Sequence, residues 1–462
     1  MSATDLSPLR DAVRGVVTLP GDDGWDDARR AFNLAADQRP AAVVHAADAD
    51  DVAATIAAAR AAGLRVAPQG TGHGAGALGP LDGTLLLRTT RLDAVAVDAE
   101  RRSARVGAGA IWRPVVEQAA AHGLSALHGS SPTVGIAGYT LGGGLGWQSR
   151  LHGLASESVT AIELVTADGR ARRVDADREP ELFWALRGGG GGFGVVTALE
   201  FDLHPLPHAF GGGLFWPGDL AREVLSAYAD WAPALPETAS TTVRLLRVPP
   251  LPTVPEALRG RTLVDVGIVV ADREEVGREL VAPLLAGLPR PLIDRLAPLA
   301  PAALAQVHGD PEEPVPGLGH HTLLDALPAE AIAALLEVAG PASGSPLLSV
   351  ELRALGGAIG RRTERTGAGG ALDAAYALYA IGVPFTPAGD DLRAAVEQRL
   401  EAVVAAMEPW KAASGFLNFA DRPGGDSAAI YDADTHGRLL AVKRAVDPEG
   451  LIVTGNPLTL PA

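Results

Sequence analysis

The stretch RVAPQGTGHGAG at residues 65–76 contains four glycines that alternate with small or polar residues, and the imidazole of His73 stands among them. Glycine lets the backbone approach a ligand closely, and successive N–H groups in such a loop form a concavity that binds anions such as phosphate. Taken alone, the loop fits a flexible surface turn better than a ligand site. A second glycine cluster at residues 135–146 shifts the balance toward a ligand site.

The segments on the N-terminal side of this loop predict a strand–helix–strand unit. Residues 41–47 have the composition of a short strand, and residues 48–62 place Val52, Ile56 and Ala59 on one helical face. Gly63 is a helix-ending residue. Residues 64–68 then predict a second strand that runs directly into the glycine loop.

Composition narrows the class of protein. The 462 residues suggest two to three domains, and 47% apolar residues can form a substantial core. The formal charge of 39 − 55 = −16 argues against a nucleic-acid partner. The absence of cysteine excludes disulfides, iron–sulfur clusters and cysteine-type zinc sites. With no signal-peptide core and no long apolar run, we expect a cytoplasmic protein without a membrane span.

The amino-acid composition changes after about residue 205: prolines cluster, and glycine clusters almost disappear. This half predicts a second, α+β layer. Its expected strands are residues 241–248, 262–270 and 347–354, and its expected helices are residues 220–231, 273–285, 328–339 and 391–407. The pair His320-His321 is interpreted as part of a loop, and no metal site is expected.

Standard nucleotide motifs are absent. The stretch from Gly70 lacks the third glycine of the dinucleotide fingerprint, and no GxxxxGK[ST] or Gly-x-Ser-x-Gly pattern occurs. Three glycine-rich loops remain, at residues 70–76, 135–146 and 188–194. Together they are expected to surround a long, phosphate-bearing cofactor.

Six motifs in a fixed order resemble one family. They are GTGHG (70–74), VGAGAIW (106–112), PTVGIAGYTLGGGLGW (132–147), HGLASE (152–157), LFWALRGGGGGFGVVT (182–197) and VKRAVDP (442–448). As a set they resemble flavoproteins of the vanillyl-alcohol-oxidase type, with a p-cresol-methylhydroxylase-like (PCMH-type) FAD domain. Within that group the chain looks most like berberine-bridge-enzyme-like oxidases, including bacterial members of the 6-hydroxynicotine-oxidase type.

The resemblance implies a two-domain α+β fold. Residues 1–207 and 416–462 would form the PCMH-type FAD-binding domain, and residues 208–415 an inserted α+β substrate domain. It also implies FAD, attached covalently through His73. The residues expected to bind the cofactor are Gln69, Gly70, Thr71, Gly72, His73, Gly74, Ser131, Val134, Gly135, Gly138, Gly142, Gly143, Gly144, Gly146, Val195 and Asn456.

Three departures from the family pattern matter. Ser131 stands where many relatives carry a second, cysteine attachment point, so His73 would be the sole anchor. The loop opens with Pro68-Gln69, so that some phosphate contacts are lost or are replaced by Gln69 and Thr71. The tail at residues 416–419 reads Phe-Leu-Asn-Phe and lacks both tyrosines of the family pattern, one of which serves as a base in relatives that oxidise sugars and alcohols.

The substrate side is expected to involve Glu351 and Arg353, which alternate with Ser349 along a strand and so project from one face. The alternative is that Glu351 and Arg353 pair with each other and have a structural role. Asn418 and Tyr139 are further catalytic candidates.

The resemblance implies oxidation of a small organic molecule, with O₂ as the expected electron acceptor. The lost tyrosines favour an amine or a secondary metabolite. An alcohol or oligosaccharide oxidase, and a non-catalytic small-molecule binder, remain the alternatives. A homodimer is possible.

Overall fold

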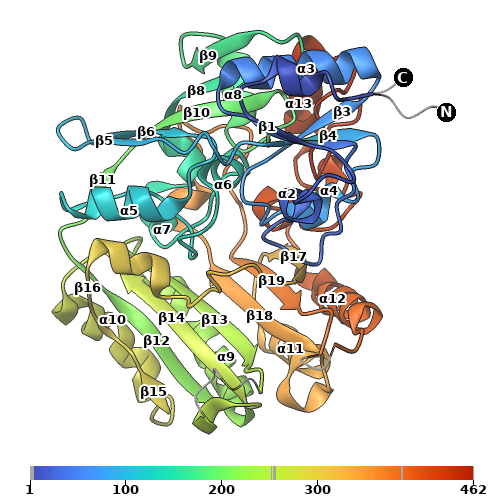
Figure 1. Ribbon diagram of the computed structural model, residues 1–462. Helices are drawn as coiled ribbons and strands as arrows, with labels where there is room; N and C mark the ends of the chain where they lie inside the picture. The colour runs from blue at the N-terminus through green and yellow to red at the C-terminus, as the bar shows by residue number, and fades with distance from the viewer. Residues whose placement is uncertain (1–4, 251, 253–255, 387–388, 461–462) are drawn as a thin grey trace.

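The computed structural model describes residues 5–250, 252, 256–386 and 389–460. In Figure 1 the N-terminal half forms the upper part of the molecule and the inserted sheet the lower part. Strand β3 (Arg65–Gln69) leads into the glycine loop from the edge of a four-stranded sheet ordered β1-β2-β4-β3. Its other strands are β1 (Val16–Thr18), β2 (Ala42–His45) and β4 (Thr84–Arg88).

The predicted strand–helix–strand unit is confirmed. Helix α3 (Ala49–Ala62) connects β2 to β3, and both strands pair in parallel with β4. The Asp48 carboxylate caps its first turn by accepting from the N–H groups of Asp50 and Asp51. Gly63 ends the helix with φ of 65°, the left-handed conformation that glycine adopts without strain. Short helices α1 (Leu9–Ala12), α2 (Trp25–Arg29) and α4 (Ala75–Leu78) flank this unit.

A second sheet of the upper part is antiparallel and ordered β5-β6-β10-β8-β9. Its strands are β5 (Val95–Asp98), β6 (Ser103–Gly107), β8 (Val159–Val165), β9 (Ala171–Asp175) and β10 (Val195–Asp202). Helices α5 (Trp112–Ala120) and α8 (Pro180–Leu186) contribute to its core, which buries Trp112 and Phe193. A separate pair, β7 (Leu124–Ser125) and β11 (His204–Pro205), lies beside it.

The glycine-rich loop expected at residues 135–146 is partly helical. Residues 127–157 contain helices α6 (Ile136–Leu141) and α7 (Ser149–His152). Tertiary contacts override the low helix propensity here, because Ile136 is fully buried and the Ile136 N–H donates to Ala110 O.

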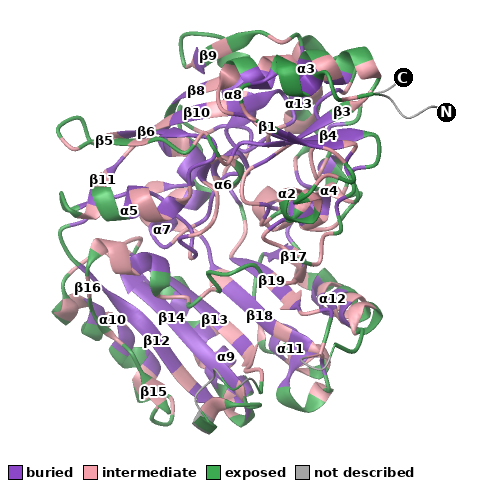
Figure 2. Ribbon diagram, in the orientation of Figure 1, coloured by how far each residue is buried: buried purple, intermediate pink, exposed green. Residues whose placement is uncertain are grey.

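The lower part is built on an eight-stranded sheet ordered β15-β12-β14-β13-β18-β19-β17, with β16 also pairing with β12. Figure 2 shows its central strands as largely buried. The strands are β12 (Ala209–Pro217), β13 (Ala239–Arg247), β14 (Thr262–Val270), β15 (Ile293–Asp294), β16 (Ala297–Leu299), β17 (Leu318–Leu324), β18 (Leu347–Ala354) and β19 (Tyr376–Gly382).

Helices cover one face of this sheet. They are α9 (Ala221–Trp231), α10 (Glu274–Ala286), α11 (Ala329–Ala339) and α12 (Arg393–Met407). Val243, Val266, Leu352 and Leu378 from that face join them in the largest apolar core. Since side chains alternate along a strand, the opposite face carries the intervening residues and is free to build a site.

The predicted strand at 347–354 and the four predicted helices are confirmed within two residues at their ends. Strands β12, β17 and β19 were not predicted. The interpretation of His320-His321 as a loop pair is wrong, because both lie within β17. None of the described helices is long and apolar enough to cross a membrane.

The end of the chain returns to the upper part. Helix α13 (Ala433–Val446) packs its Leu439 and Val442 into the core of the second sheet. The buried Lys443 ammonium donates to Gly192 O at 2.6 Å and pairs with the buried Asp447 carboxylate at 2.5 Å. This pairing explains the VKRAVDP motif, and it ties the tail to the glycine-rich half. The division of the chain at 207/208 and 415/416 stays a proposal.

We expect Lys443→Met to destabilise the protein strongly, because it leaves the Asp447 carboxylate buried without its cation. The free energy of unfolding should fall by about 3–5 kcal/mol in urea denaturation. Arg438→Met is the matched control, since Arg438 pairs with Glu181 on the surface and its loss should cost under about 1 kcal/mol. Equal losses in the two variants would contradict the anchoring role.

Candidate functional site

The glycine clusters meet in space. A Cβ at Gly135 would lie 3.4 Å from the Thr71 hydroxyl, so the start of α6 lies against the 70–74 loop. The third loop joins them, because the N–H groups of Gly188 and Gly190 both donate to Leu141 O, at 3.0 and 2.9 Å. The structure therefore brings the three loops together.

His73 is held in a defined orientation where the first two loops meet. Its Nδ1 lies 2.8 Å from the Thr71 hydroxyl, and its ring stacks on Phe32 at 3.6 Å with an interplanar angle of 14°. Burial lowers the pKa of His73 to about 4, partly opposed by the charge of Asp310. The imidazole is thus neutral at physiological pH. Its Nε2 is buried without a hydrogen-bond partner among the described residues.

Gln69 and Thr71 do not have free side chains to replace lost phosphate contacts. The Gln69 amide accepts from Arg88 and donates to Gln38 at 3.1 Å, while the Thr71 hydroxyl is engaged with His73. Arg88 is buried and has no carboxylate partner within the described part of the chain, and burial lowers its pKa to about 10. Any contact of this loop to phosphate therefore relies on backbone N–H groups.

Gly72 shows why the loop needs glycine. Its φ is 85°, and a Cβ there would lie 2.8 Å from the Ala31 Cβ. Both features exclude other residues unless the neighbouring segment moves.

The remaining predicted cofactor residues fall into two groups. Gly138, Gly142, Gly143, Gly144 and Gly146 lie in or directly after α6. Ser131, Val134, Val195 and Asn456 have partners within the protein. The Ser131 hydroxyl lies 3.1 Å from that of Thr133, and Asn456 donates to Ala420 O at 2.9 Å. Val134 and Val195 pack against separate apolar cores of the upper part.

The residues present fit a large polar cofactor. Buried polar groups normally have hydrogen-bond partners. Around the glycine loops, however, several buried atoms have none in the described ranges: His73 Nε2, Trp112 Nε1, Tyr139 OH, Thr140 Oγ1 and both amide atoms of Gln148. Such a concentration of unpartnered donors and acceptors is the chemistry that a bound FAD would satisfy.

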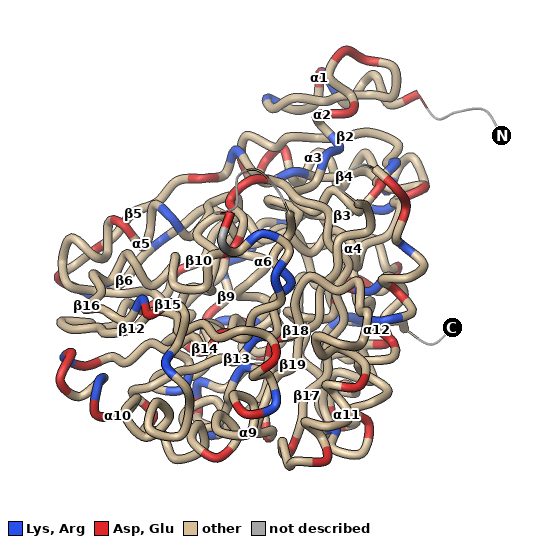
Figure 3. The backbone as a smooth tube through the Cα atoms, turned by 90° about the horizontal axis from the view of Figure 1, so that it is seen from below, with Lys and Arg blue, Asp and Glu red and all other residues tan. Residues whose placement is uncertain are grey.

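A row of polar side chains crosses the helix-free face of the inserted sheet. Strand register places Asp265, Arg244, Glu351, Tyr379 and His321 directly opposite one another on five successive strands. Figure 3 shows basic and acidic residues close together around β13, β14 and β18. The row lies on the face opposite the apolar core, where it can meet the upper part.

An ionic network connects this row to the glycine-rich half. His308 lies between two carboxylates, with Asp310 and Glu351 each 2.6 Å from one of its ring nitrogens. Burial opposes protonation, but Glu351 and Asp310 together raise the pKa of His308 to about 9. Asp310 also accepts a 2.6 Å hydrogen bond from Ser130. Sequence reasoning missed His308 and Asp310, which lie in a loop without a recognisable motif.

Glu351 and Arg353 lie on one face and pair with each other, while Glu351 also pairs with His308. Arg353 Nε is 2.5 Å from Glu351 Oε1, although the geometry is not that of a hydrogen bond. Glu351 is buried, which raises its pKa, yet Arg353 and His308 outweigh burial and hold the pKa well below its usual range. Arg244 completes the network through a two-point pair with Asp265, at 2.9 and 2.7 Å.

The two other catalytic candidates have structural surroundings. Asn418 accepts from the Gly144 N–H and donates to Tyr139 O, both at 2.9 Å, so its amide ties the tail to the glycine cluster. Tyr139 packs edge-on against Trp112 at 5.6 Å, and burial raises its pKa. We therefore regard Asn418 as a positioning residue rather than a catalytic one.

Tyr379 and Asp421 form a pair that sequence reasoning missed. The Tyr379 hydroxyl donates to Asp421 at 2.5 Å, and its ring lies 5.0 Å from that of Phe419 in the tail. Asp421 is beside the glycine-rich loop at residues 70–76, because its backbone oxygen would be 3.2 Å from a Cβ at Gly76. Gly319 leaves room for the pair, since a Cβ there would lie 2.3 Å from the phenol oxygen.

Comparison with known proteins agrees with this arrangement. A family model described as an FAD binding domain matches residues 40–175. (R)-6-hydroxynicotine oxidase from Paenarthrobacter nicotinovorans is 34% identical over 246 residues, which are 53% of this chain and 50% of that protein. An uncharacterized FAD-linked oxidoreductase of Bacillus subtilis (strain 168), YvdP, is 32% identical over 308 residues, 66% of each chain. The chain thus spans about half of the length of the first relative.

Solved structures extend the likeness over the whole fold. A 6-hydroxy-D-nicotine oxidase from Arthrobacter nicotinovorans superposes with a TM-score of 0.80 at 26% identity, covering 98% of this chain and 99% of that one. A BBE-like 1 variant from Physcomitrella patens gives 0.85 at 20% identity, covering 99% and 100%, which shows likeness of fold alone. The chain belongs to the family of FAD-linked oxidoreductases that share this FAD binding domain.

Proposed function

We propose that the protein is an FAD-dependent oxidoreductase that oxidises a small organic molecule, with O₂ as the final acceptor and H₂O₂ as the product. One observation carries this proposal: Asp310 connects the polar row of the inserted sheet with the glycine-rich half. It accepts a hydrogen bond from Ser130, and its charge acts on His73. Asn418 holds the tail against Gly144. The glycine loops would then form the cofactor side of the site, and the polar row of the inserted sheet would form its substrate side.

The cofactor side and the substrate side have separate roles in this proposal. The glycine loops would hold the FAD phosphates through backbone N–H groups, and bound FAD supplies a two-electron acceptor. The inserted sheet would orient the substrate. His308, Asp310 and Glu351 keep one another charged and fixed, so that the substrate meets a pre-organised polar surface.

We further propose that His73 attaches the FAD covalently and is its single anchor. An unprotonated ring nitrogen is the nucleophile such a bond requires, and the low pKa of His73 keeps it unprotonated. Ser131 is the residue at the family's second attachment position, and the chain contains no cysteine.

A second candidate is oxidation of an alcohol, which the pair Tyr379 and Asp421 favours. The tail carries phenylalanines where relatives have tyrosines, and Tyr379 places a phenol beside Phe419 from a neighbouring strand. A substrate hydroxyl proton would move to the Tyr379 oxygen while the phenol proton moves to Asp421. Burial raises the pKa of Asp421 to about 6, against the opposing effect of the Tyr379 hydrogen bond, which suits a proton acceptor near neutral pH.

The covalent link predicts a simple result for His73→Ala. After acid precipitation the wild-type pellet should be yellow, whereas the variant should release its FAD into the supernatant. His122→Ala, at an exposed histidine, serves as the control and should keep a yellow pellet. A yellow His73→Ala pellet would show that another residue holds the cofactor. A wild-type protein that contains no flavin would overturn the proposed function itself.

Substrates can be screened by anaerobic bleaching of the flavin absorbance, and Tyr379→Phe then separates the two candidates. For an alcohol we expect flavin reduction to slow by about 100-fold or more, because the proton acceptor is lost. For an amine that binds neutral, the rate should change little. Tyr376→Phe is the matched control, because Tyr376 lies on the same strand but faces the apolar core. Similar slowing in both variants would contradict a role for the Tyr379 hydroxyl.

The buried Asp421 carboxyl also predicts a pH dependence of stability. Its pKa is about 6 in the native state against an ordinary value of 3.8, so the native state binds the proton more tightly. Stability should therefore fall as pH rises from about 4 to about 6, by roughly 2–3 kcal/mol from this group. Asp421→Asn should remove that part of the slope in urea denaturation, whereas Asp434→Asn, at an exposed site, should not. An unchanged slope would refute the shifted pKa.

A further inference from the structure

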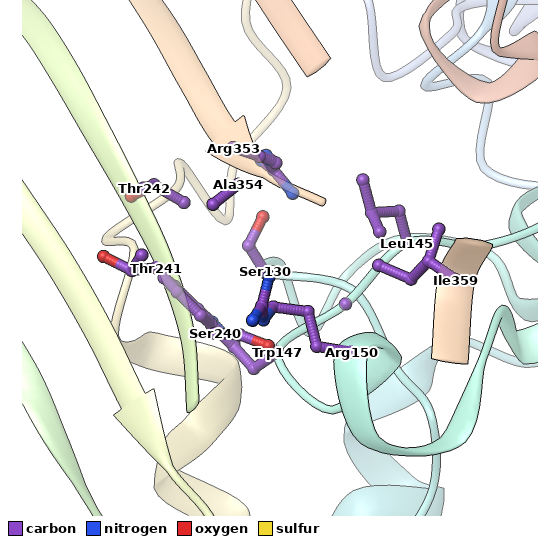
Figure 4. A pocket seen from close by; sticks show the side chains of 11 residues that line it. Ser130, Leu145, Trp147, Arg150, Ser240, Thr241, Thr242, Arg353, Ala354 and Ile359 are labelled. Carbon is purple, nitrogen blue, oxygen red and sulfur yellow. The ribbon is translucent and has the colours of Figure 1, made fainter. Parts of the chain in front are cut away.

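A pocket lies where the glycine-rich half meets the inserted sheet. It is bounded by Ser130, Trp147 and Arg150 from the upper part and by Ser240, Thr242 and Arg353 from the sheet side, and its space for water-sized groups is about 20 Å³. Figure 4 shows Arg353 projecting from the end of its strand, with the Ser130 hydroxyl pointing toward it in this view. Two arginines and no carboxylate line this pocket.

The two arginines differ in what they have left to offer. All three nitrogens of Arg150 donate to backbone carbonyl oxygens, of Ala239, Leu235 and Leu355. Arg150 is therefore a structural tie. Arg353 touches Glu351 through Nε and lies over the Phe419 ring at 5.3 Å, but it makes no hydrogen bond to any described residue. Its terminal N–H groups remain available to a ligand.

A second unused donor belongs to Trp147, which lines the same pocket. Trp147 is 7% exposed, and its indole N–H has no partner among the described residues. Because an indole N–H can only donate, a ligand atom that satisfies it must be an acceptor. A guanidinium binds a carboxylate through two parallel hydrogen bonds, which makes a planar anion its best partner.

The neighbouring residues balance the positive charge of Arg353 but leave its terminal N–H groups free. Glu351 lies between Arg353 and His308, so its charge is shared with the imidazolium. Counting His308 as charged, the network has three cations, Arg244, His308 and Arg353, and three anions, Asp265, Asp310 and Glu351. Because the network has no net charge, the choice of ligand depends on which N–H donors are free and where they point.

We propose that this pocket binds a carboxylate carried by the substrate, with Arg353 and Trp147 as the donors. The assignment rests on the proposed function and narrows its substrate class to carboxylate-bearing molecules. Arg353 then positions the substrate and discriminates between charged and neutral groups.

Benzoate and benzamide test the assignment, because they share a shape and differ in charge. Each would be titrated into the purified holoenzyme by isothermal calorimetry, without turnover. We expect benzoate to bind at least about tenfold more tightly than benzamide, the discrimination that a charge-assisted pair provides. Arg353→Met should abolish this preference by weakening benzoate about tenfold while leaving benzamide within about twofold.

Trp147→Phe and Arg222→Met complete the design. The first removes the indole N–H with little change of shape and should weaken benzoate about threefold to tenfold. The second makes the Arg353 change at an exposed position of α9 and should alter neither ligand. Equal binding of the two ligands, no binding of either, or a preference that survives Arg353→Met would overturn the proposal. These outcomes are independent of flavin content and bleaching, which test the proposed function.

Discussion

The contact on which the site depends is the chain of short hydrogen bonds from Ser130 through Asp310 and His308 to Glu351. It crosses between a loop of the glycine-rich half and the third strand from the far edge of the inserted sheet. Buried charges are costly unless they are paired and hydrogen-bonded. Each member of this chain removes that cost for its neighbour, so the two halves are held in one relative position.

The same requirement explains the division of labour across the inserted sheet. Its helix-covered face is apolar and supplies stability, while its other face concentrates polar residues in one row. Successive side chains of a strand point to opposite faces, so one strand contributes to the apolar face and to the polar face. A polar surface against the cofactor loops thus comes from the ordinary alternation of a strand.

Local signals made part of the fold predictable. The helix over residues 49–62 has a capping aspartate and a terminal glycine, and the strand at 347–354 alternates cleanly. Strand β12 was missed because its three consecutive glycines disfavour a strand. Pairing with β14 on one side and with β15 and β16 on the other stabilises it. Strand β17 was missed because two adjacent histidines suggest no period.

The part of the candidate site that consists of glycine-rich loops was predictable from the sequence. The three loops and His73 were identified from residue type and spacing, whereas the pair Tyr379 and Asp421 was not. These two residues are 42 positions apart, and one lies on an unpredicted strand. Their meeting depends on strand order, which no local pattern contains. Gln69 shows the converse, since its place in the cofactor loop was clear from sequence but its commitment to Arg88 required the tertiary structure.

The anchoring of the tail has a consequence for the order in which the site can form during synthesis. Asn418 fixes the glycine cluster, and Lys443 with Asp447 fixes the third glycine loop, yet all three residues are translated more than 200 residues after the loops that they hold. Domains tend to fold as they emerge from the ribosome. The first 207 residues therefore emerge with their loops unsupported, and tight capture of the cofactor must wait until the last segment has left the ribosome.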